Sequence, residues 1–315
     1  MCGISGLISF KPLTEHRLKI ARALSKRLIT NSEIRGRDAS GIAAISFASE
    51  FNIIYKEGIK GSELAKKPEF TETIKSGSQI ILLHTRAATH GKVEVSANNH
   101  PHYNKETGNT LIHNGIISNY EDLKKAYGLV MDGDCDSEII LKLIDKFGFN
   151  KAIKKISGSV AIAHNNQTDK LLSLYRNSGN PLNLVYLKQY DFFIFCSTKD
   201  ILDESLSFGE AEYYGLTFPK TLPYLKLSFD ENDKYVFNFN NQQVKAWSGI
   251  KTKEWVWKSK DTEKDYGSYK GYYYDTDKQA FLPYNQKRTN QTTNPSKFKD
   301  ELNDSKWDDK WDVEN

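Results

Sequence analysis

The stretch His113-Asn114-Gly115-Ile116-Ile117-Ser118-Asn119-Tyr120 follows a short apolar and β-branched run at 110–113. Runs of this kind, bounded by polar or glycine-containing segments, are typical of β-strands. Taken alone, Asn114-Gly115 also fits an ordinary two-residue hairpin turn. A second stretch, His84-Thr85-Arg86-Ala87-Ala88-Thr89-His90-Gly91, follows the apolar run 79–84 in the same way. Each stretch therefore places polar side chains where a predicted strand ends.

Working outward from these stretches, the rest of the chain alternates strand-like runs with a few helical ones. Further strands are predicted at 3–10, 41–47, 51–55, 159–164, 171–175, 182–186 and 192–197. Apolar residues recur at helical spacing in 16–29 and in 137–147, continuing after a break into 151–156. Asp136 and Ser137 form a natural start for the second helix. Many strands with a few long helices favour sheets faced by helices over a βαβ repeat.

The chain divides by composition into a domain, residues 1–245, and a tail, residues 246–315. Segments 224–229 and 234–239 read as extended, with a turn-like stretch between them, and close the domain. Beyond about residue 250 the composition turns to Lys, Asp, Asn, Thr and Tyr, which predicts a disordered or partner-dependent tail. Beyond residue 250 the tail carries four tryptophans, Trp255, Trp257, Trp307 and Trp311. The last two are spaced to share one helical face, as in a docking segment, although an unstructured tail remains open.

The bulk properties exclude several classes of protein. The chain has 315 residues, 38% of them hydrophobic, and a mean hydropathy of −0.60. No apolar run approaches the roughly 18 residues of a membrane span, and the first residues do not read as a secretory signal. The net charge of +4 comes from mixed, scattered charges, which argues against a nucleic-acid partner. Three cysteines without a paired or metal-like spacing fit a cytoplasmic setting.

Cys2 is the first candidate for chemistry. Removal of Met1 would leave this cysteine with a free α-amine, which titrates near pH 7.7–8.0. The amine would lie within reach of its own thiol, so one residue could supply both nucleophile and base. A cysteine at position 2 is weak evidence by itself, because many chains carry one by chance.

Four later stretches strengthen the case when they are taken in order behind Cys2. They are RGRDASG at 35–41, HTRAATHG at 84–91, HNGIISNY at 113–120 and DCDSE at 134–138. Each has an ordinary reading alone: the histidines could be satisfied core residues, and Asp136 a helix cap. Together they resemble the class II glutamine amidotransferases, which are N-terminal-nucleophile hydrolases. The resemblance is greatest to the glutaminase domain of glucosamine-6-phosphate synthase, which reads HTRWATHG, NAHPH, HNGIIENY and TDTE where this chain has HTRAATHG, NNHPH, HNGIISNY and CDSE.

The resemblance covers about residues 2 to 205 and implies both a fold and a reaction. The fold would be α+β, a four-layer αββα sandwich of two antiparallel sheets between helical layers, with the nucleophile at the start of the first strand. The reaction would be hydrolysis of the L-glutamine side-chain amide to glutamate and ammonia through a Cys2 thioester. No cofactor is expected.

Site roles follow from the same resemblance. Asn114 and the Gly115 N–H match an oxyanion hole, Arg86 the partner of the substrate α-carboxylate, and Asp136 the partner of its α-ammonium group. Thr89 and His90 fall in the loop that lines the glutamine pocket, and Arg35 matches an arginine that supports the nucleophile end. Asp38, Cys135 and Cys196 are expected to be structural. His100 and His102 are expected to bind no metal, because no Cys/Asp/His cluster is seen to complete a site.

Two departures limit what the resemblance implies. Ala87 stands where the look-alike has tryptophan, which puts closure of the pocket and coupling to an ammonia channel in doubt. No phosphosugar-binding, phosphoribosyl-diphosphate or ATP-pyrophosphatase motif follows residue 210. The leading hypothesis is therefore a glutaminase that supplies ammonia to a separate synthase, recruited through the tail. The alternatives are a hydrolase of another γ-glutamyl or amide compound, and a catalytically silent binding or structural module in which Met1 is retained.

Overall fold

The computed structural model describes residues 1–251, 272–275 and 280–283. Strands predominate, and the strand pairs within the sheets are antiparallel. The predicted tail 246–315 lies outside the described residues except for 246–251 and a two-stranded ribbon, β16 (Tyr272–Asp275) with β17 (Ala280–Pro283). Trp255, Trp257, Trp307 and Trp311 are outside it. The docking hypothesis for the tail stays a prediction.

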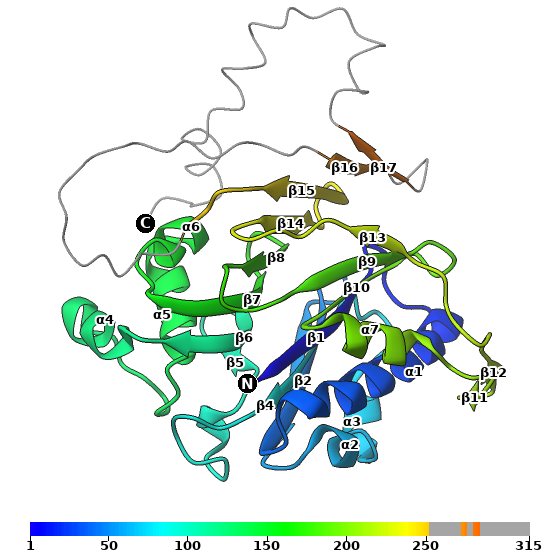
Figure 1. The fold of residues 1–315 in the computed structure, drawn as a ribbon, viewed down its shortest axis with the longest axis horizontal. Coiled ribbons are helices and arrows are strands. Elements are labelled where there is room, and N and C mark those ends of the chain that lie inside the picture. Colours follow the sequence, from blue (N-terminus) through cyan, green and yellow to red (C-terminus); the bar gives the residue numbers. More distant parts are fainter. Residues whose placement is uncertain (252–271, 276–279, 284–315) are drawn as a thin grey trace, which may run out of the picture.

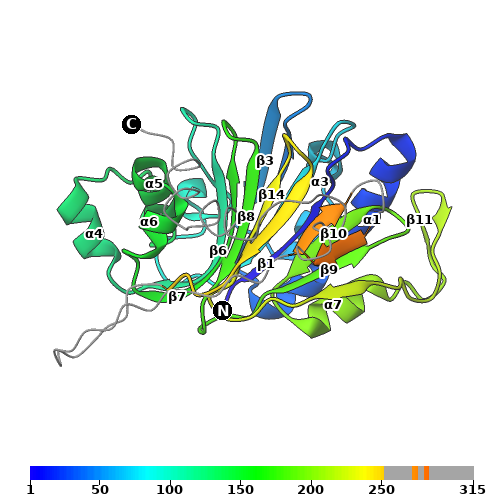
Figure 2. The same ribbon diagram turned by 90° about the horizontal axis from the view of Figure 1, so that it is seen from above.

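Two large sheets form the centre of the molecule (Figures 1 and 2). The first has the order β13-β9-β10-β1-β4-β2-β3. Its strands are β1 (Gly3–Ile8), β2 (Ala39–Ser46), β3 (Phe51–Glu57), β4 (Ile80–Arg86), β9 (Asn183–Leu187), β10 (Phe192–Cys196) and β13 (Leu225–Leu227). The second sheet has the order β15-β14-β8-β7-β6-β5. Its strands are β5 (His102–Tyr103), β6 (Thr110–Ile117), β7 (Gly158–Asn166), β8 (Leu171–Arg176), β14 (Lys234–Asn238) and β15 (Gln243–Trp247).

Each sheet carries its helices on the face away from the other sheet (Figure 2). The first sheet is covered by α1 (Glu15–Ser32), α2 (Gly61–Leu64), α3 (Pro68–Thr73) and α7 (Lys199–Leu206). The second is covered by α4 (Tyr120–Tyr127), α5 (Glu138–Phe147) and α6 (Phe149–Ile153). The remaining elements are short: η1 (Glu33–Arg35), η2 (Ser96–Asn98), and a ribbon of β11 (Glu212–Tyr213) with β12 (Leu216–Thr217). The αββα sandwich expected from the sequence is confirmed.

Three apolar cores hold these layers together. One lies between the sheets and joins, for example, Ile4 of β1 to Ile112 of β6. The other two lie between each sheet and its helices. Strands β1 and β2 are buried along their whole length because both of their faces pack against a core, whereas β3 is half-buried at the edge of its sheet. Burial of apolar area at about 25 cal/mol per Å² makes these cores the main source of stability.

The described part of the chain contains no helix with the length and apolarity needed to cross a bilayer.

The lowered pKa values of two buried histidines predict that the protein loses stability in mild acid. Burial lowers the pKa of His84 and of His164 from 6.5 to about 3. Between pH 6.5 and 3 the unfolded chain therefore binds protons at these positions that the folded chain does not, so stability present above pH 6.5 is lost as the pH falls. The slope should be about 1.4 kcal/mol per pH unit for each histidine.

Urea unfolding from pH 7.5 down to pH 5, above the main titration range of carboxylates, measures this loss. We expect the midpoint to fall steadily below pH 6.5, and less steeply in His164→Gln. A midpoint that stays constant between pH 6.5 and 5 would show that these histidines are not held neutral by burial.

Candidate active site

Cys2 lies at the start of β1, where its thiol is half-buried. The Sγ atom is 3.6 Å from the carbonyl oxygen of Ala87, to which it donates. Burial raises the pKa of this thiol above its ordinary value, so a nearby base is required to form the thiolate at neutral pH. Arg35 Nε donates to the Cys2 carbonyl at 2.7 Å, which fits the expected support of the nucleophile end. Met1 is 78% exposed, so its removal would take away no core contact.

Strand register brings Arg86 to Cys2. Gly3 is paired with Thr85 across β1 and β4, and Arg86 ends β4 opposite Ala39 of β2. The RGRDASG turn packs against this point so closely that a Cβ atom at Gly36 would lie 2.3 Å from the Arg86 carbonyl carbon. Only glycine fits there, and the turn is thereby held beside the end of β4.

The Arg86 guanidinium is 2% exposed and organises the loop that follows it. Nη1 donates to Asn99 Oδ1 at 2.8 Å, and Nη2 donates to the carbonyl oxygens of His90 and of Gly91, the latter at 3.0 Å. A guanidinium has five N–H donors, and Nε makes no hydrogen bond to any residue that the structure describes. Arg86 therefore fixes the loop and keeps donors for a carboxylate ligand.

Asn114 and Gly115 belong to β6 and not to a hairpin turn. They pair with Ala161 and Val160 of β7, so the turn reading of this dipeptide is wrong. Gly115 has a φ of 150°, and a Cβ atom there would lie 1.8 Å from the Ser159 carbonyl oxygen. This backbone conformation is open to glycine and strained for other residues. Glycine at 115 thus allows β6 to continue through a position that a side chain would block.

The Asn114 side chain faces Asn180, a residue for which the sequence predicted no role. Asn114 Nδ2 and Asn180 Oδ1 are 3.1 Å apart, and the other amide atom of each residue is buried without a partner among the described residues. The oxygen and nitrogen of an amide are interchangeable by a flip. With both amides flipped, Asn180 donates to Asn114 Oδ1 and the Asn114 N–H donors become free. Asn180 lies in the YRNSGNPL stretch at 175–182, after β8, so chain order alone did not reveal this contact.

Asp136 is buried beside the end of β6. Its Oδ2 accepts a hydrogen bond of 2.7 Å from the Ile117 backbone N–H. The N-cap of α5 is Ser137, so the reading of Asp136 as a helix cap is wrong. Asp136 and Arg86 both act electrostatically on the Cys2 thiol, with Arg86 lowering its pKa and Asp136 raising it. One buried cation and one buried anion therefore flank the nucleophile.

Thr89 and His90 lie in the loop after β4. Thr89 is exposed, and its hydroxyl contacts His90 Nδ1 at 3.2 Å. The His90 ring packs edge-on to Tyr120, at 5.6 Å between centroids. The structure does not bring either side chain into contact with Cys2, so their predicted role in lining the pocket stays a prediction. Asp38 accepts from the Ala88 N–H at 2.7 Å, in keeping with a structural role.

The expectation that no cysteine completes a cluster with His100 and His102 is wrong. Donor atoms of His100, His102 and Cys135 all lie within 4.8 Å of one another, and all three residues are buried. Cys135 and Cys196 are both buried free thiols, as expected. His100 and Cys135 come from segments more than thirty residues apart in the chain, and spacing could not show that they meet.

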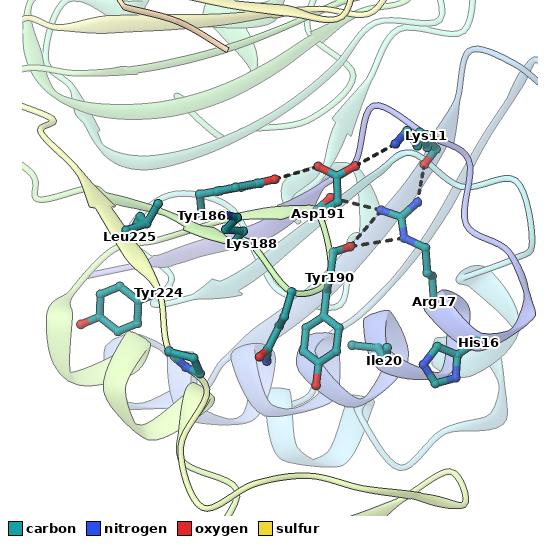
Figure 3. Close-up of a pocket in the computed structure, with 12 residues that line it drawn as sticks. Lys11, His16, Arg17, Ile20, Tyr186, Lys188, Tyr190, Asp191, Tyr224 and Leu225 are labelled. Atoms are coloured by element: carbon teal, nitrogen blue, oxygen red, sulfur yellow. Dashed lines mark hydrogen bonds and ion pairs between the residues drawn. The ribbon is translucent and has the colours of Figure 1, made fainter. Parts of the chain in front are cut away.

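A cavity of about 970 Å³ opens elsewhere on the molecule (Figure 3). It lies beyond the far end of β1 from Cys2, and none of the predicted site residues lines it. Three of its charged groups are engaged in the fold: Arg17 donates to the carbonyl oxygens of Tyr190 and Asp191, and Lys11 pairs with Asp191 at 3.5 Å. We therefore give this cavity no part in the chemistry at Cys2.

Comparisons with known proteins identify similar sequences and folds. Residues 84–204 match the family described as "Glutamine amidotransferase domain". Similar proteins include the "Glutamine--fructose-6-phosphate aminotransferase [isomerizing]" of Staphylococcus epidermidis, 32% identical over 193 residues, which are 58% of this chain and 30% of that protein. The protein of the same name from Staphylococcus aureus is 32% identical over 195 residues, with the same shares of each chain. The chain thus spans under a third of the length of these relatives.

Two solved structures share the fold. One is described as the structure of the allosteric regulatory enzyme of purine biosynthesis, with a TM-score of 0.59 and 17% identity over 78% of this chain and 48% of that one. The other is the glutamine phosphoribosylpyrophosphate amidotransferase of B. subtilis, with a TM-score of 0.57, 18% identity and the same coverage. At this identity the likeness supports the fold alone.

Proposed function

Since this chain carries a class II glutamine amidotransferase domain, we propose that it hydrolyses the side-chain amide of glutamine to glutamate and ammonia, with Cys2 as nucleophile. The observation that carries the proposal is the pair of buried opposite charges, Arg86 and Asp136, beside the Cys2 thiol. A free α-amino acid has one carboxylate and one ammonium group. A guanidinium suits the carboxylate because its donors form a planar fork, and a carboxylate suits the ammonium group.

The proposed mechanism begins once Met1 has been removed. The free α-amine of Cys2 takes the thiol proton, and the thiolate attacks the amide carbon. Charge that develops on the amide oxygen is stabilised by the Asn114 side-chain N–H and the Gly115 backbone N–H. Protonated amine then delivers the proton to the leaving nitrogen, ammonia departs, and a γ-glutamyl thioester forms. Water hydrolyses this thioester, which yields glutamate and the free thiol.

The substrate class is tested by comparing glutamine with analogues that each lack one charge. Full-length protein should release glutamate and ammonia from L-glutamine. It should turn over glutaramate, which lacks the α-ammonium group, and γ-aminobutyramide, which lacks the α-carboxylate, far more slowly. Equal rates with all three would show that Arg86 and Asp136 do not select an α-amino acid, and would favour a different amide substrate.

Asn180 provides a sharper test of the oxyanion site, because it is expected to orient Asn114. Asn180→Ala removes the orienting donor and should lower kcat on the order of 10-fold, with little change in KM. Asn180→Asp can only accept from Asn114 Nδ2, so it should turn the needed donor away and cost more than alanine does. Steady-state kinetics of both variants measure this order. If aspartate were harmless, or if both variants raised KM alone, Asn180 would have no orienting role.

The destination of the ammonia is a separate part of the proposal. We infer that an acceptor domain or a separate synthase subunit receives it, recruited through the tail. Support comes from the names of the relatives, which pair glutamine with a second substrate, and from the small share of their length that this chain spans. Co-purification with and without residues 252–315 tests the tail.

A reduced thiol at Cys2 is needed for catalysis, which favours a reducing compartment such as the cytoplasm.

A further inference from the structure

Three buried potential metal ligands meet where two loops of the glutamine pocket cross. His100 follows η2, His102 begins β5, and Cys135 precedes α5. They are 2%, 3% and 4% exposed, and one donor atom from each lies within 4.8 Å of the other two. Bulk solvent therefore does not supply hydrogen-bond partners for their polar atoms.

Three of the four ring nitrogens of these histidines are buried without a hydrogen-bond partner among the described residues. Neither Nδ1 nor Nε2 of His100 has one among the described residues, and His102 Nε2 has none either. The rings lie close together, at 4.3 Å between centroids and 70° between planes. Buried polar atoms are nearly always paired in native structures, so three unpaired nitrogens at one place call for a ligand. A ligand that accepts lone pairs from both rings and from sulfur would satisfy them.

We propose that His100, His102 and Cys135 bind a divalent ion of the Zn²⁺ class. Two imidazoles and one thiolate form a donor set that Zn²⁺ prefers, and the fourth tetrahedral position would hold water. Bonds of about 2.0–2.1 Å to nitrogen and about 2.3 Å to sulfur require donors about 3.3–3.8 Å apart. The donor atoms here lie within 4.8 Å of one another, so binding an ion would draw them together by at most about 1.5 Å.

Two negative groups and one positive group lie around the cluster. Asp136 Oδ1 lies 3.9 Å from Cys135 Sγ, so one carboxylate and one thiolate would face the ion. Lys56 is the opposing cation: its ammonium group donates to the carbonyl oxygens of Asn99 and Pro101, at 2.6 and 2.9 Å. It is thereby fixed to the backbone next to His100. The two negative groups match the charge of a divalent ion.

The cluster lies next to the residues expected to hold the substrate, so a bound ion would affect the shape of the pocket. Asn99, next to His100, accepts from the Arg86 guanidinium, and Asp136 follows Cys135 directly. An ion that joined His100 to Cys135 would therefore set the spacing between the two charges expected to hold the substrate. The site itself requires no glutamine chemistry, so it stands or fails independently of the proposed function.

Spectroscopy with Co²⁺ on metal-stripped full-length protein tests the proposal. We expect thiolate-to-cobalt charge-transfer absorption and tetrahedral d–d bands that saturate at one equivalent and are abolished by competing Zn²⁺. Cys135→Thr should remove the charge-transfer band and weaken Zn²⁺ binding on the order of 100-fold or more, since loss of a direct ligand should exceed the 10- to 100-fold effect of outer-shell changes. His102→Gln retains the thiol and should weaken binding comparably, which guards against misfolding of the first variant.

Two cysteine controls separate this site from others. Cys196→Ser changes a buried thiol outside the cluster and should leave the spectrum unchanged. Cys2→Ala removes a thiol that could chelate cobalt together with a free α-amine, and should also leave it unchanged. The proposal is overturned if wild-type protein shows no saturable band, or if the band survives Cys135→Thr and disappears in Cys2→Ala.

Discussion

Replacement of Cys2 by alanine is expected to abolish glutamate release from glutamine, with a loss in kcat on the order of 10⁶-fold, as for other deletions of a nucleophile. Cys2 is the half-buried thiol beside Arg86 and Asp136, whereas Cys135 and Cys196 are buried. Burial and the neighbouring Asp136 raise the pKa of Cys135 to about 11, and burial raises the pKa of Cys196 still further. Both of these thiols are buried and are expected to stay protonated at neutral pH, so we expect neither to replace Cys2 as the nucleophile.

Cys196→Ala is the matched control for this variant. The Cys196 thiol donates to the Thr198 carbonyl at 3.2 Å, within the core between β10 and the helices. Its loss should lower stability and leave the activity per folded molecule unchanged. A coupled glutamate dehydrogenase assay measures both variants, with circular dichroism to report folding. Equal activity in the two variants would refute the assignment of Cys2.

Asn114→Ala is expected to lower kcat on the order of 100- to 1000-fold with little effect on KM, because it removes a donor that acts on charge developing in the transition state. Asn114 is 1% exposed and its side-chain amide contacts Asn180, and Gly115 beside it is paired with Val160 within the sheet. The donor is therefore preorganised before glutamine binds, which is the property that makes such a donor effective.

An exposed asparagine provides the comparison for this second variant. Asn240 donates to the Asp169 carbonyl in a surface turn, and Asn240→Ala should retain full kcat. Stopped-assay kinetics over a range of glutamine concentrations separate kcat from KM. A change confined to KM in Asn114→Ala would mean that Asn114 contacts the bound substrate and does not stabilise an oxyanion.

The strands were readily predicted from the sequence, and the short helices were not. β1, β2 and β4 are rich in apolar residues, because both of their faces pack against cores. The helices α2, α3, α4 and α7 are only four to eight residues long, so they span too few turns for a helical period to stand out. The four-layer arrangement came from the resemblance, since strand counting alone does not order strands in a sheet.

Site residues that belong to sequence motifs were predicted. Contacts that form between segments far apart in the chain were missed. The motifs place Cys2 and Arg86 at strand ends and Asp136 at a helix start, and in the fold Arg86 and Asp136 both affect the pKa of the Cys2 thiol. The Asn114–Asn180 pair and the meeting of His100 with Cys135 depend on which strands and loops become neighbours. Neither contact has a signature in local spacing. Local sequence can also mislead: Asn114-Gly115 is a typical turn dipeptide, yet it lies within a strand here.

The most direct test of the central claim is covalent trapping of the nucleophile. Full-length protein is treated with 6-diazo-5-oxo-L-norleucine, a glutamine analogue that alkylates nucleophiles in glutamine sites, and is then analysed by intact and peptide mass spectrometry. The account predicts one adduct per chain, on the Cys2 side chain of molecules that have lost Met1, and protection by L-glutamine. Retention of Met1 in all molecules, or an adduct at Cys135 or Cys196 with Cys2 unmodified, would contradict it.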